Sequence, residues 1–481
     1  MVFLVELTKE LLSEVIDYSK IEDNSHILNS FSSDYSLETG VNPQFVIYPT
    51  NDDEVIRILR LANKLKIPII PSSSREKYYG ATIPKKGGII LDFKKMNKIL
   101  KINYKDRYIV IEPGVTYDQL IPELRKHGLR ISVPLGYPSS ASVVSTYIER
   151  VPLLTGPKVL LSEGWQCILN MHIILANGMT LDTGTANWCK DKPNFLPSGP
   201  HGGPDLSRLF SGAQGTLGIV TKLVIKAKYL PKYRSVVFVE FNDLEDCLSK
   251  IRSILWYDKS REMLIISKKN LALILSEKMT DNEINDVMNK CPEWLLVIGL
   301  ESEDKEKYKI DIEDFKQFGI EVKENLILNN IQLNKLFLNE IELPRRLVNF
   351  RYYKNAQHIP FYINKDKISD LNKGVNRICT ENNYEMNNLF GYLMPIEQGH
   401  TFYMDYTIHY NKNEIDTKKI IEFFKQLSEF ILNNGGVIDR PYNLWSDQIF
   451  SKNPALFEFL KQIKKQLDPN GILNPGRMGL E

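Results

Sequence analysis

Near the start of the chain, two short apolar runs flank a segment whose apolar residues recur at helical spacing. FVIYP at 45–49 and PIIP at 68–71 are short apolar runs, as buried strands are. Between them Val55, Ile58 and Leu59 recur at helical spacing. The pattern therefore predicts a β–α–β unit that ends with the second run. Because α/β sheets place ligand sites beyond the carboxyl ends of their strands, the loop after this unit is predicted to bind a ligand.

That loop has the composition of a phosphate-binding turn. It reads PSSSREKYYGATIPKKGG, with three serines, an arginine, two tyrosines and one glycine before the final Gly-Gly turn. Serine hydroxyls and main-chain amides donate hydrogen bonds to phosphate oxygens, and an arginine adds positive charge. The alternative is an ordinary polar turn between two strands.

Three further segments of the first half are rich in small residues. PLGYPSSASVVST at 134–146 has neither a helical nor a strand period and is predicted to form a second ligand loop. Asn177-Gly178 predicts a hairpin turn within 168–186. LFSGAQGTLGIVTK at 209–222 runs through glycines into a strand.

The chain changes character after Pro231. Residues 232–430 have longer helical patterns and few glycines, which predicts a second domain of α+β type. Within it, TFYMDYTIHYN alternates with period two and places Tyr403, Asp405 and His409 on one strand face. A face this polar belongs either to a strand at a solvent-facing sheet edge or to a strand that covers a ligand.

Composition limits the class of protein. A chain of 481 residues suggests two or three domains. Its 61 basic and 59 acidic residues nearly balance, so the net charge gives no sign of binding to nucleic acid or to an anionic membrane. The five cysteines form no C-x-x-C pair, which argues against a disulfide scaffold, an iron–sulfur cluster and a structural zinc site. The first twenty residues predict an amphipathic helix and not a signal peptide, and no window has the ~18 apolar residues of a membrane span. We therefore expect a cytoplasmic protein.

Four segments together resemble the FAD-binding family of vanillyl-alcohol oxidase and p-cresol methylhydroxylase. Within that family the chain is most similar to glycolate oxidase and D-lactate dehydrogenase flavoprotein subunits. The segments are the first loop with its following strand (68–100), IVIEPGVTYDQLIPELRKHGL, LFSGAQGTLGIVTK and the closing LDPNGILNPGRMGL. The resemblance implies an α+β fold: a two-subdomain FAD-binding domain over 1–231, an α+β cap domain with an antiparallel sheet over 232–430, and a return of 431–481 to the FAD-binding domain.

The same resemblance implies where FAD is held. The two loops would bind the pyrophosphate, the glycine-rich segment would lie against the flavin ring, and Arg477 would stabilise negative charge on the reduced ring. The implied cofactor-binding residues are Ser72, Ser73, Ser74, Arg75, Glu76, Tyr79, Gly80, Pro134, Ser139, Ser140, Ser142, Gly215, Thr216, Gly218, Ile219, Val220, Asn474 and Arg477. The first loop contains no histidine, and we expect the FAD to be bound without a covalent link.

On the substrate side, the resemblance implies a base for the substrate hydroxyl and arginines for a carboxylate. The implied catalytic residues are Tyr403, His409, Arg346, Arg440 and Tyr442. Members of the family that oxidise hydroxy acids hold a metal with an H-x-G-D-G-N-x-H strand. Phe402 stands here where the first histidine belongs, so we expect no divalent metal.

The predicted function is an FAD-dependent dehydrogenase that oxidises a small hydroxy acid, such as glycolate or D-lactate, by hydride transfer to flavin N5. Because the chain has no cluster motif, electrons would pass to a separate acceptor, such as an iron–sulfur or electron-transfer flavoprotein subunit. We also expect an oligomer. Two alternatives stay open: a flavin oxidase or hydroxylase of a para-substituted phenol or aromatic alcohol, and a non-catalytic FAD-binding electron-transfer subunit.

Overall fold

The computed structural model describes most of the chain. The described residues are 7–73, 79–134, 137–151, 167–184, 204–256, 260, 262–339, 342–347, 355–385, 389–396, 399–410 and 417–480. We expected an amphipathic helix over the first twenty residues. Among the described residues of this segment, the helix α1 covers Lys9–Ser13 and a 3-10 turn follows at Tyr18–Lys20.

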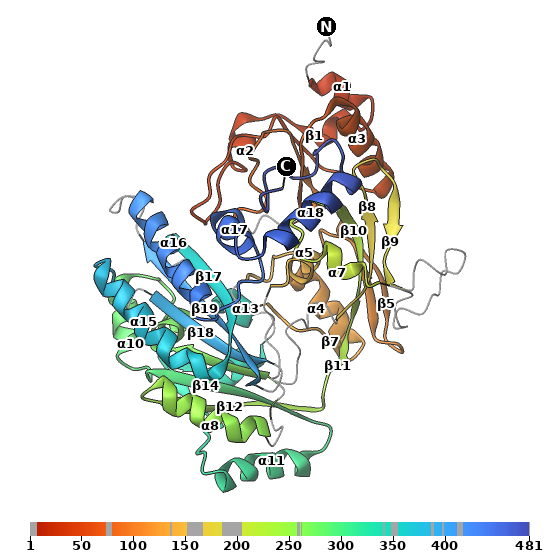
Figure 1. The fold of residues 1–481 in the computed structure, drawn as a ribbon. Coiled ribbons are helices and arrows are strands. Elements are labelled where there is room, and N and C mark those ends of the chain that lie inside the picture. Colours follow the sequence, from red (N-terminus) through yellow and green to blue (C-terminus); the bar gives the residue numbers. More distant parts are fainter. Residues whose placement is uncertain are drawn as a thin grey trace.

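The first sheet contains the predicted β–α–β unit. Its strands are β1 (Ile21–Glu22), β2 (Phe45–Ile47), β4 (Ile89–Asp92) and β3 (Ile69–Ser72), in that spatial order, and the last three are parallel. Helix α3 (Asp52–Leu65) connects β2 to β3, and Asn51 caps it by accepting a hydrogen bond from the Glu54 amide at 3.0 Å. Helix α3 and strand β1 are labelled in the red part of the chain in Figure 1. The β–α–β prediction is confirmed, and β3 ends where the first ligand loop was predicted to begin.

The second sheet is antiparallel. Its order is β5 (Ile99–Asn103), β6 (Tyr108–Ile111), β10 (Ile219–Lys226), β8 (Ile168–Ile174) and β9 (Thr180–Asp182), with α4 (Tyr117–Lys126), α5 (Val143–Ile148) and α7 (Ser207–Phe210) between strands. The Asn177-Gly178 hairpin is confirmed between β8 and β9, where the Gly178 amide donates to Leu175 O. A small ladder of β7 (Leu129–Arg130) with β11 (Lys228–Tyr229) leads towards the third sheet.

The third sheet has six antiparallel strands. Their order is β12 (Tyr233–Phe241), β14 (Trp294–Ser302), β13 (Glu262–Ser267), β18 (Leu389–Ile396), β19 (Thr401–Tyr410) and β17 (Asn355–Ile363). Its helices are α8 (Leu244–Trp256), α9 (Lys268–Leu275), α10 (Asp281–Met288), α11 (Lys305–Gln317), α12 (Leu333–Leu338), α13 (Glu342–Leu347), α15 (Ile368–Glu381) and α16 (Thr417–Asn433).

The two faces of this sheet pack against different layers. Met404 and Tyr406 of β19 pack in one core with Val375 of α15 and Phe423 of α16, whereas Tyr403 packs in the core that includes β6, β8 and β10. Since β19 lies between β18 and β17 and Tyr403, Asp405 and His409 are buried, the alternative of a solvent-facing edge strand was wrong.

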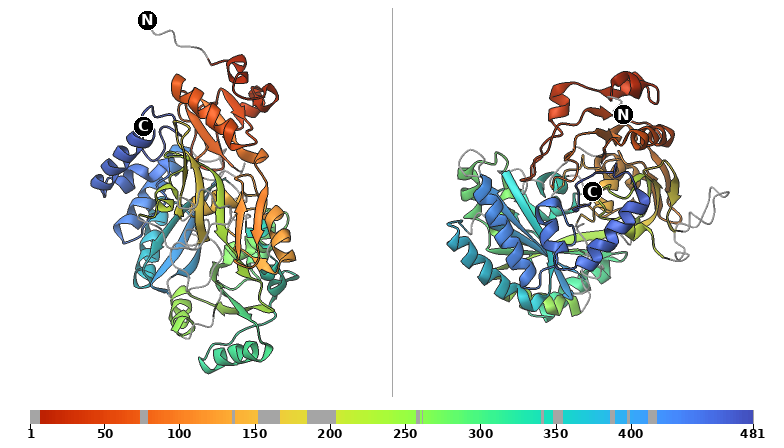
Figure 2. Two further views of the ribbon diagram at one scale, coloured as in Figure 1. Left: turned by 90° about the vertical axis from the view of Figure 1, so that its right-hand side faces the viewer. Right: turned by 45° about the horizontal axis from the view of Figure 1, so that its top comes forward.

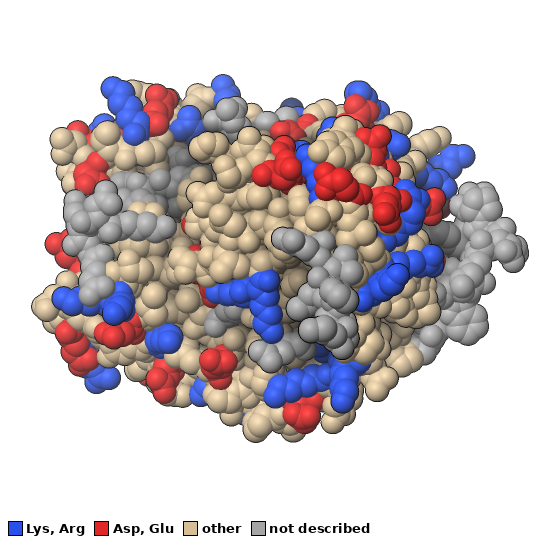
Figure 3. Space-filling view, turned by 90° about the horizontal axis from the view of Figure 1, so that it is seen from above, with Lys and Arg blue, Asp and Glu red and all other residues tan. Residues whose placement is uncertain are grey.

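The C-terminal segment returns to the first sheet. After α17 (Asn443–Phe450) and α18 (Pro454–Leu467), the main chain of Ile472 accepts a hydrogen bond from the Ile69 amide at 2.7 Å. Its dark-blue helices lie where the third sheet meets the red-to-yellow part of the chain (Figure 2). Seen from above, acidic and basic side chains are interspersed on the visible face (Figure 3).

Candidate flavin-binding and active site

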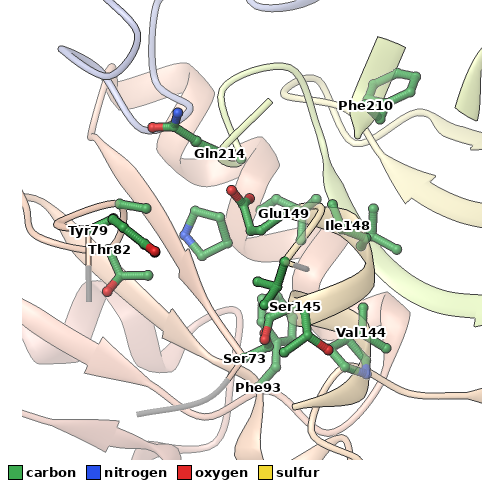
Figure 4. A pocket seen from close by; sticks show the side chains of 18 of the residues that line it. Ser73, Tyr79, Thr82, Phe93, Val144, Ser145, Ile148, Glu149, Phe210 and Gln214 are labelled. Carbon is green, nitrogen blue, oxygen red and sulfur yellow. The ribbon is translucent and has the colours of Figure 1, made fainter. Parts of the chain in front are cut away.

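A cavity opens at the carboxyl end of β3, between the first and second sheets (Figure 4). Its empty space is about 1000 Å³ when the open solvent at its mouth is included. Its walls include the end of β3, the turn from Tyr79 to Thr82, helix α5, Phe210 of α7, the run from Gln214 to Val220, and Tyr442 from the C-terminal segment. The position beyond a strand's carboxyl end is the one that the sequence predicts for a ligand.

Seven of the residues predicted from the sequence line this cavity. They are Ser73, Tyr79, Gly215, Gly218, Ile219, Val220 and Tyr442. Ser72, Gly80, Pro134, Ser139, Ser140, Ser142 and Thr216 lie in the same loops but do not form the wall. Ser74, Arg75 and Glu76 are outside the described residues.

Helix α5 adds polar groups that the sequence analysis missed. The Ser142 hydroxyl donates to Pro113 O at 2.6 Å and accepts from the Ser145 amide, so it caps the helix. The capped helix then presents Ser145 and Glu149 to the cavity (Figure 4). The sequence could have shown a short helix that begins after a capping serine. The spacing of its residues does not show which face of the helix meets the ligand.

Two buried polar atoms in the wall lack a partner. Thr82 Oγ1 and Gln214 Oε1 make no hydrogen bond to any described residue. Leaving a buried polar atom without a partner is unfavourable, so such atoms in a cavity wall point to a polar ligand. Apolar walls combined with serine and threonine hydroxyls suit FAD, which joins a flat ring to a polar pyrophosphate chain. The residues present therefore fit this cofactor.

The glycines of the run GAQGTLG are required by close packing of the wall. Gly215 has φ +70°, and a Cβ there would lie 2.4 Å from Pro71 Cγ. A Cβ on Gly218 would lie 2.6 Å from Ile173 Cγ2. Gly215 thus lets its segment lie close to the end of β3, and Gly218 lets it lie close to β8.

Replacing Gly215 with alanine is expected to lower both the apparent Tm and the FAD content of the purified protein. The new Cβ must push Pro71, which lines the cavity, and the left-handed backbone adds about 1 kcal/mol of strain. Gly128→Ala is the matched control, because Gly128 has φ +65° but no atom within 4 Å of the new Cβ. Equal losses of flavin in the two variants, measured by the absorbance ratio of flavin to protein, would contradict this account.

The closing motif holds the cavity loops together. The Asn474 side-chain amide donates to Ala81 O at 2.9 Å and to Gln214 O at 2.7 Å, and both acceptor residues line the cavity. Arg477 is fully buried, donates to Ile83 O and lies 3.7 Å from Glu38. Burial lowers the pKa of Arg477, while the charge of Glu38 opposes this shift. Asn474 thus holds two segments of the wall together, whereas Arg477 contacts Ile83 and Glu38, which do not line the cavity.

A cluster of an arginine and aromatic rings lies between the cavity and the third sheet. The Tyr79 ring stacks on Tyr442 at 4.7 Å between centroids, and the Arg440 guanidinium carbon lies 5.2 Å from the Tyr79 ring centre. Arg440 is 1% exposed and donates to Tyr403 Oη at 3.3 Å. Its Nε and Nη1 make no hydrogen bond to described residues, although the Asp439 carboxylate lies 3.5 Å from Nε. Burial alone would lower the pKa of Arg440, but Tyr79, Tyr403 and Asp439 raise it well above its usual value.

Glu149 joins this cluster to the cavity wall. Tyr442 Oη donates to Glu149 Oε2 at 3.3 Å. Burial raises the pKa of Glu149, against the opposing charges of Arg150 and Arg440. Burial also raises the pKa of Tyr442 well above its usual value, so the phenol keeps its proton at neutral pH. The pair places a proton donor beside an acid that resists ionisation.

His358 of β17, which the sequence does not single out, places its ring against the cavity wall. Its ring lies edge-on to Tyr79 at 6.3 Å, with Nδ1 2.9 Å from Thr407 Oγ1 and 3.5 Å from Asp405 Oδ1. His409 is buried in the same sheet, where its main-chain groups exchange hydrogen bonds with Tyr384 Oη.

Arg346 lies elsewhere in the third-sheet layer. It is on α13 and donates to Ile274 O of α9 at 3.3 Å. Within the described part of the chain, no three His, Cys, Asp or Glu side chains come together as a metal site.

Two family models match the chain. Residues 43–184 match the FAD binding domain, and residues 366–478 match the C-terminal domain of FAD linked oxidases. The chain is 28% identical over 247 residues to the glycolate oxidase subunit GlcD of Bacillus subtilis, a match that spans 51% of this chain and half of that protein. It is 22% identical over 485 residues to D-2-hydroxyglutarate dehydrogenase of Stutzerimonas stutzeri, covering 97% of each.

Solved structures share the fold along almost the whole chain. p-Cresol methylhydroxylase superposes with a TM-score of 0.83 at 20% identity, and 4-ethylphenol oxidase from Gulosibacter chungangensis with 0.82 at 19%. Both superpositions cover 98% of this chain and 96% of the other.

The fold, the cavity and the two matched domains define an FAD-linked oxidoreductase. The chain belongs to the FAD-linked oxidases with the fold of p-cresol methylhydroxylase, and it is related to glycolate oxidase and to the D-lactate and D-2-hydroxyglutarate dehydrogenases. The predicted family and fold class are thereby confirmed. None of the described helices has the length and apolarity needed to cross a bilayer.

Proposed function

We propose that the chain oxidises a small organic molecule that carries a negatively charged group, and that this group binds to Arg440. Bound FAD would accept two electrons and a hydrogen from the substrate. Ser73, Thr82, Ser145 and Gln214 would hold the cofactor, with the Gly215–Gly218 segment against it. Residues 1–231 and 431–481 would form the FAD-binding domain and 232–430 the cap domain, and the FAD would be held without a covalent link.

Arg440 is the observation that carries the proposal. The Arg440 guanidinium is 1% exposed, and two of its donor atoms lack hydrogen bonds among the described residues. It lies 5.2 Å from the ring centre of Tyr79, which lines the cavity. Buried arginines favour carboxylates, which they bind with two parallel hydrogen bonds. The first candidate substrate is therefore a 2-hydroxy acid, the class named in glycolate oxidase and D-2-hydroxyglutarate dehydrogenase.

The second candidate is a para-substituted phenol, favoured by the rings around Arg440. Tyr79, Tyr442, Tyr403 and Trp445 lie within ring or hydrogen-bond contact of one another or of the guanidinium. Such a group would pack against a flat aromatic substrate, and the tyrosine hydroxyl and guanidinium would bind a phenolate oxygen. The broken metal motif of the hydroxy-acid members also fits this candidate.

Anaerobic bleaching of the flavin absorbance separates these candidates. We expect bleaching within seconds to minutes by one of two panels: glycolate, D-lactate and D-2-hydroxyglutarate, or p-cresol and 4-ethylphenol. Bleaching by neither panel would instead support a non-catalytic FAD-binding subunit. Acid precipitation of the same sample tests the covalent link, because yellow colour in the pellet would overturn the expectation of dissociable FAD.

A further inference from the structure

Helices α18 and α7 are labelled near each other in Figure 1. An apolar groove lies where residues of the two helices meet. Its apolar lining residues are Leu209 of α7 and Phe459, Ile463 and Leu467 of α18, and its empty space is about 960 Å³ when open solvent is included. Phe459 is 59% exposed, and Leu456 on the same stripe is 46% exposed. The apolar stripe of a surface helix normally faces the core, whereas on α18 the fully buried side chain is Lys464. Leu209, Ile463 and Leu467 are partly buried against the core, so the part of the stripe that is available to a partner lies around Leu456 and Phe459.

The groove lies directly behind the wall of the flavin cavity. Leu209 lines the groove, while Phe210, the next residue, lines the cavity and is 4% exposed. The two sites are thus separated at this point by the four-residue helix α7. Helix α18 is also tied to the cavity wall, because Lys464 Nζ donates to Thr216 O at 2.8 Å.

The groove carries a small positive charge. Lys465 lines it and forms no ion pair with a described residue, whereas Arg208 pairs with Asp205 at 3.3 Å and Lys461 with Glu458 at 3.9 Å. Lys465 is the charged residue among those that line the groove, so the lining itself carries a charge of +1. A complementary partner has an apolar patch bordered by carboxylates. Encounters between redox proteins use small interfaces, below about 1,200 Å² in total, which suits one groove.

We propose that this groove is the docking site of the electron acceptor, a redox protein with acidic residues around an apolar patch. The inference rests on one part of the proposed function, namely that electrons pass from the reduced FAD to a separate protein. In this step reduced FAD gives up two electrons and one proton. Two molecules of a one-electron acceptor take one electron each, and the proton passes to solvent. The groove lies next to the flavin cavity, and an electron acceptor must bind close to the flavin. A second copy of the chain has no such requirement, so the position of the groove favours the acceptor.

The test uses the holoprotein reduced by light with a deazaflavin, so that no substrate is required. Reoxidation is followed anaerobically in a stopped-flow instrument with plastocyanin, an acidic one-electron protein acceptor, and separately with ferricyanide. Phe459→Glu is expected to lower the second-order rate with plastocyanin about tenfold and to leave the ferricyanide rate within about twofold, because it places a like charge at the docking surface only. Trp256→Glu is the matched control, since Trp256 is 81% exposed on α8 of the third-sheet layer.

Lys465→Glu provides a second, milder variant, and binding of oxidised plastocyanin to oxidised holoprotein provides a second readout. Both variants should weaken that binding, and added salt should weaken it further. Three results would overturn the proposal: no saturable reoxidation of the wild type by plastocyanin, equal rates for Phe459→Glu and wild type, or a Phe459→Glu protein that changes only from dimer to monomer. The last result would assign the groove to a second copy. Failure of every substrate panel would refute the proposed substrate but leave this test intact.

Discussion

Replacing Arg440 with glutamine is expected to lower kcat/KM for flavin reduction by the substrate about 30- to 4000-fold. Removing one partner of a buried, hydrogen-bonded charge pair costs about 2–5 kcal/mol, and each 1.4 kcal/mol is a factor of ten. Among described residues Arg440 donates one side-chain hydrogen bond, to Tyr403, and lies 3.5 Å from the Asp439 carboxylate, so two of its donor atoms are left for the substrate anion. FAD content should stay close to that of the wild type, since Arg440 does not line the flavin cavity.

Two other variants sharpen this expectation. Arg440→Lys keeps the charge but lacks the planar fork, so it should recover only part of the loss. Arg346→Gln tests the rival anchor that the sequence suggests. Since Arg346 donates to a main-chain carbonyl of α9, we expect a much smaller change in KM than for Arg440→Gln. A large rise in KM for Arg346→Gln together with normal kinetics for Arg440→Gln would move the anchor to α13.

The parts of the site that the sequence predicted are those set by local pattern. Strand β3 and its loop follow from two apolar runs around a helix, and the cavity indeed opens where that unit ends. Gly215 and Gly218 were expected in the wall because only glycine permits such close approach. The atoms they approach, Pro71 and Ile173, belong to distant segments, and a sequence alone does not show such partners.

The parts that the sequence missed depend on contacts between distant segments. Gln214 donates to Pro441 O across 227 positions, and the Tyr79 ring meets His358 of the third sheet. A single histidine or glutamine in a strand or loop forms no periodic pattern, so the sequence does not show that it contacts a distant segment. Serine composition was also ambiguous: the Ser142 hydroxyl caps α5, a role that looks the same in sequence as a ligand contact.

The closing motif illustrates how a strong sequence signal can serve the fold. Asp468 in LDPNGILNPGRM accepts hydrogen bonds from the Ile472 amide at 3.0 Å and the Leu473 amide at 2.7 Å. Lys464 Nζ donates to Asp468 at 2.6 Å and to Leu473 O at 2.7 Å. Burial lowers the pKa of Lys464, and the charge of Asp468 opposes this shift. The motif therefore fastens the end of the chain beside the cavity loops.

Replacing Lys464 with methionine is expected to remove about 3–5 kcal/mol of stability, because it leaves the Asp468 carboxylate buried without its cation. The third acceptor of Lys464 is Thr216 O, next to Gly215 in the cavity wall, so the variant should also lose FAD. The measurements are the apparent Tm of the holoprotein and the concentration of free FAD needed to restore flavin absorbance.

The neighbouring residue offers a matched comparison for the same substitution. Lys465 is exposed on the same helix, so Lys465→Met should leave Tm and FAD affinity near wild-type values. Lys464→Met combined with Asp468→Asn removes both charges and should recover part of the lost stability, since a neutral amide is cheaper to bury than an unpaired carboxylate. If Lys464→Met and Lys465→Met instead melted at the same temperature with the same FAD affinity, the buried ion pair would not be what holds the C-terminal segment against the cavity wall.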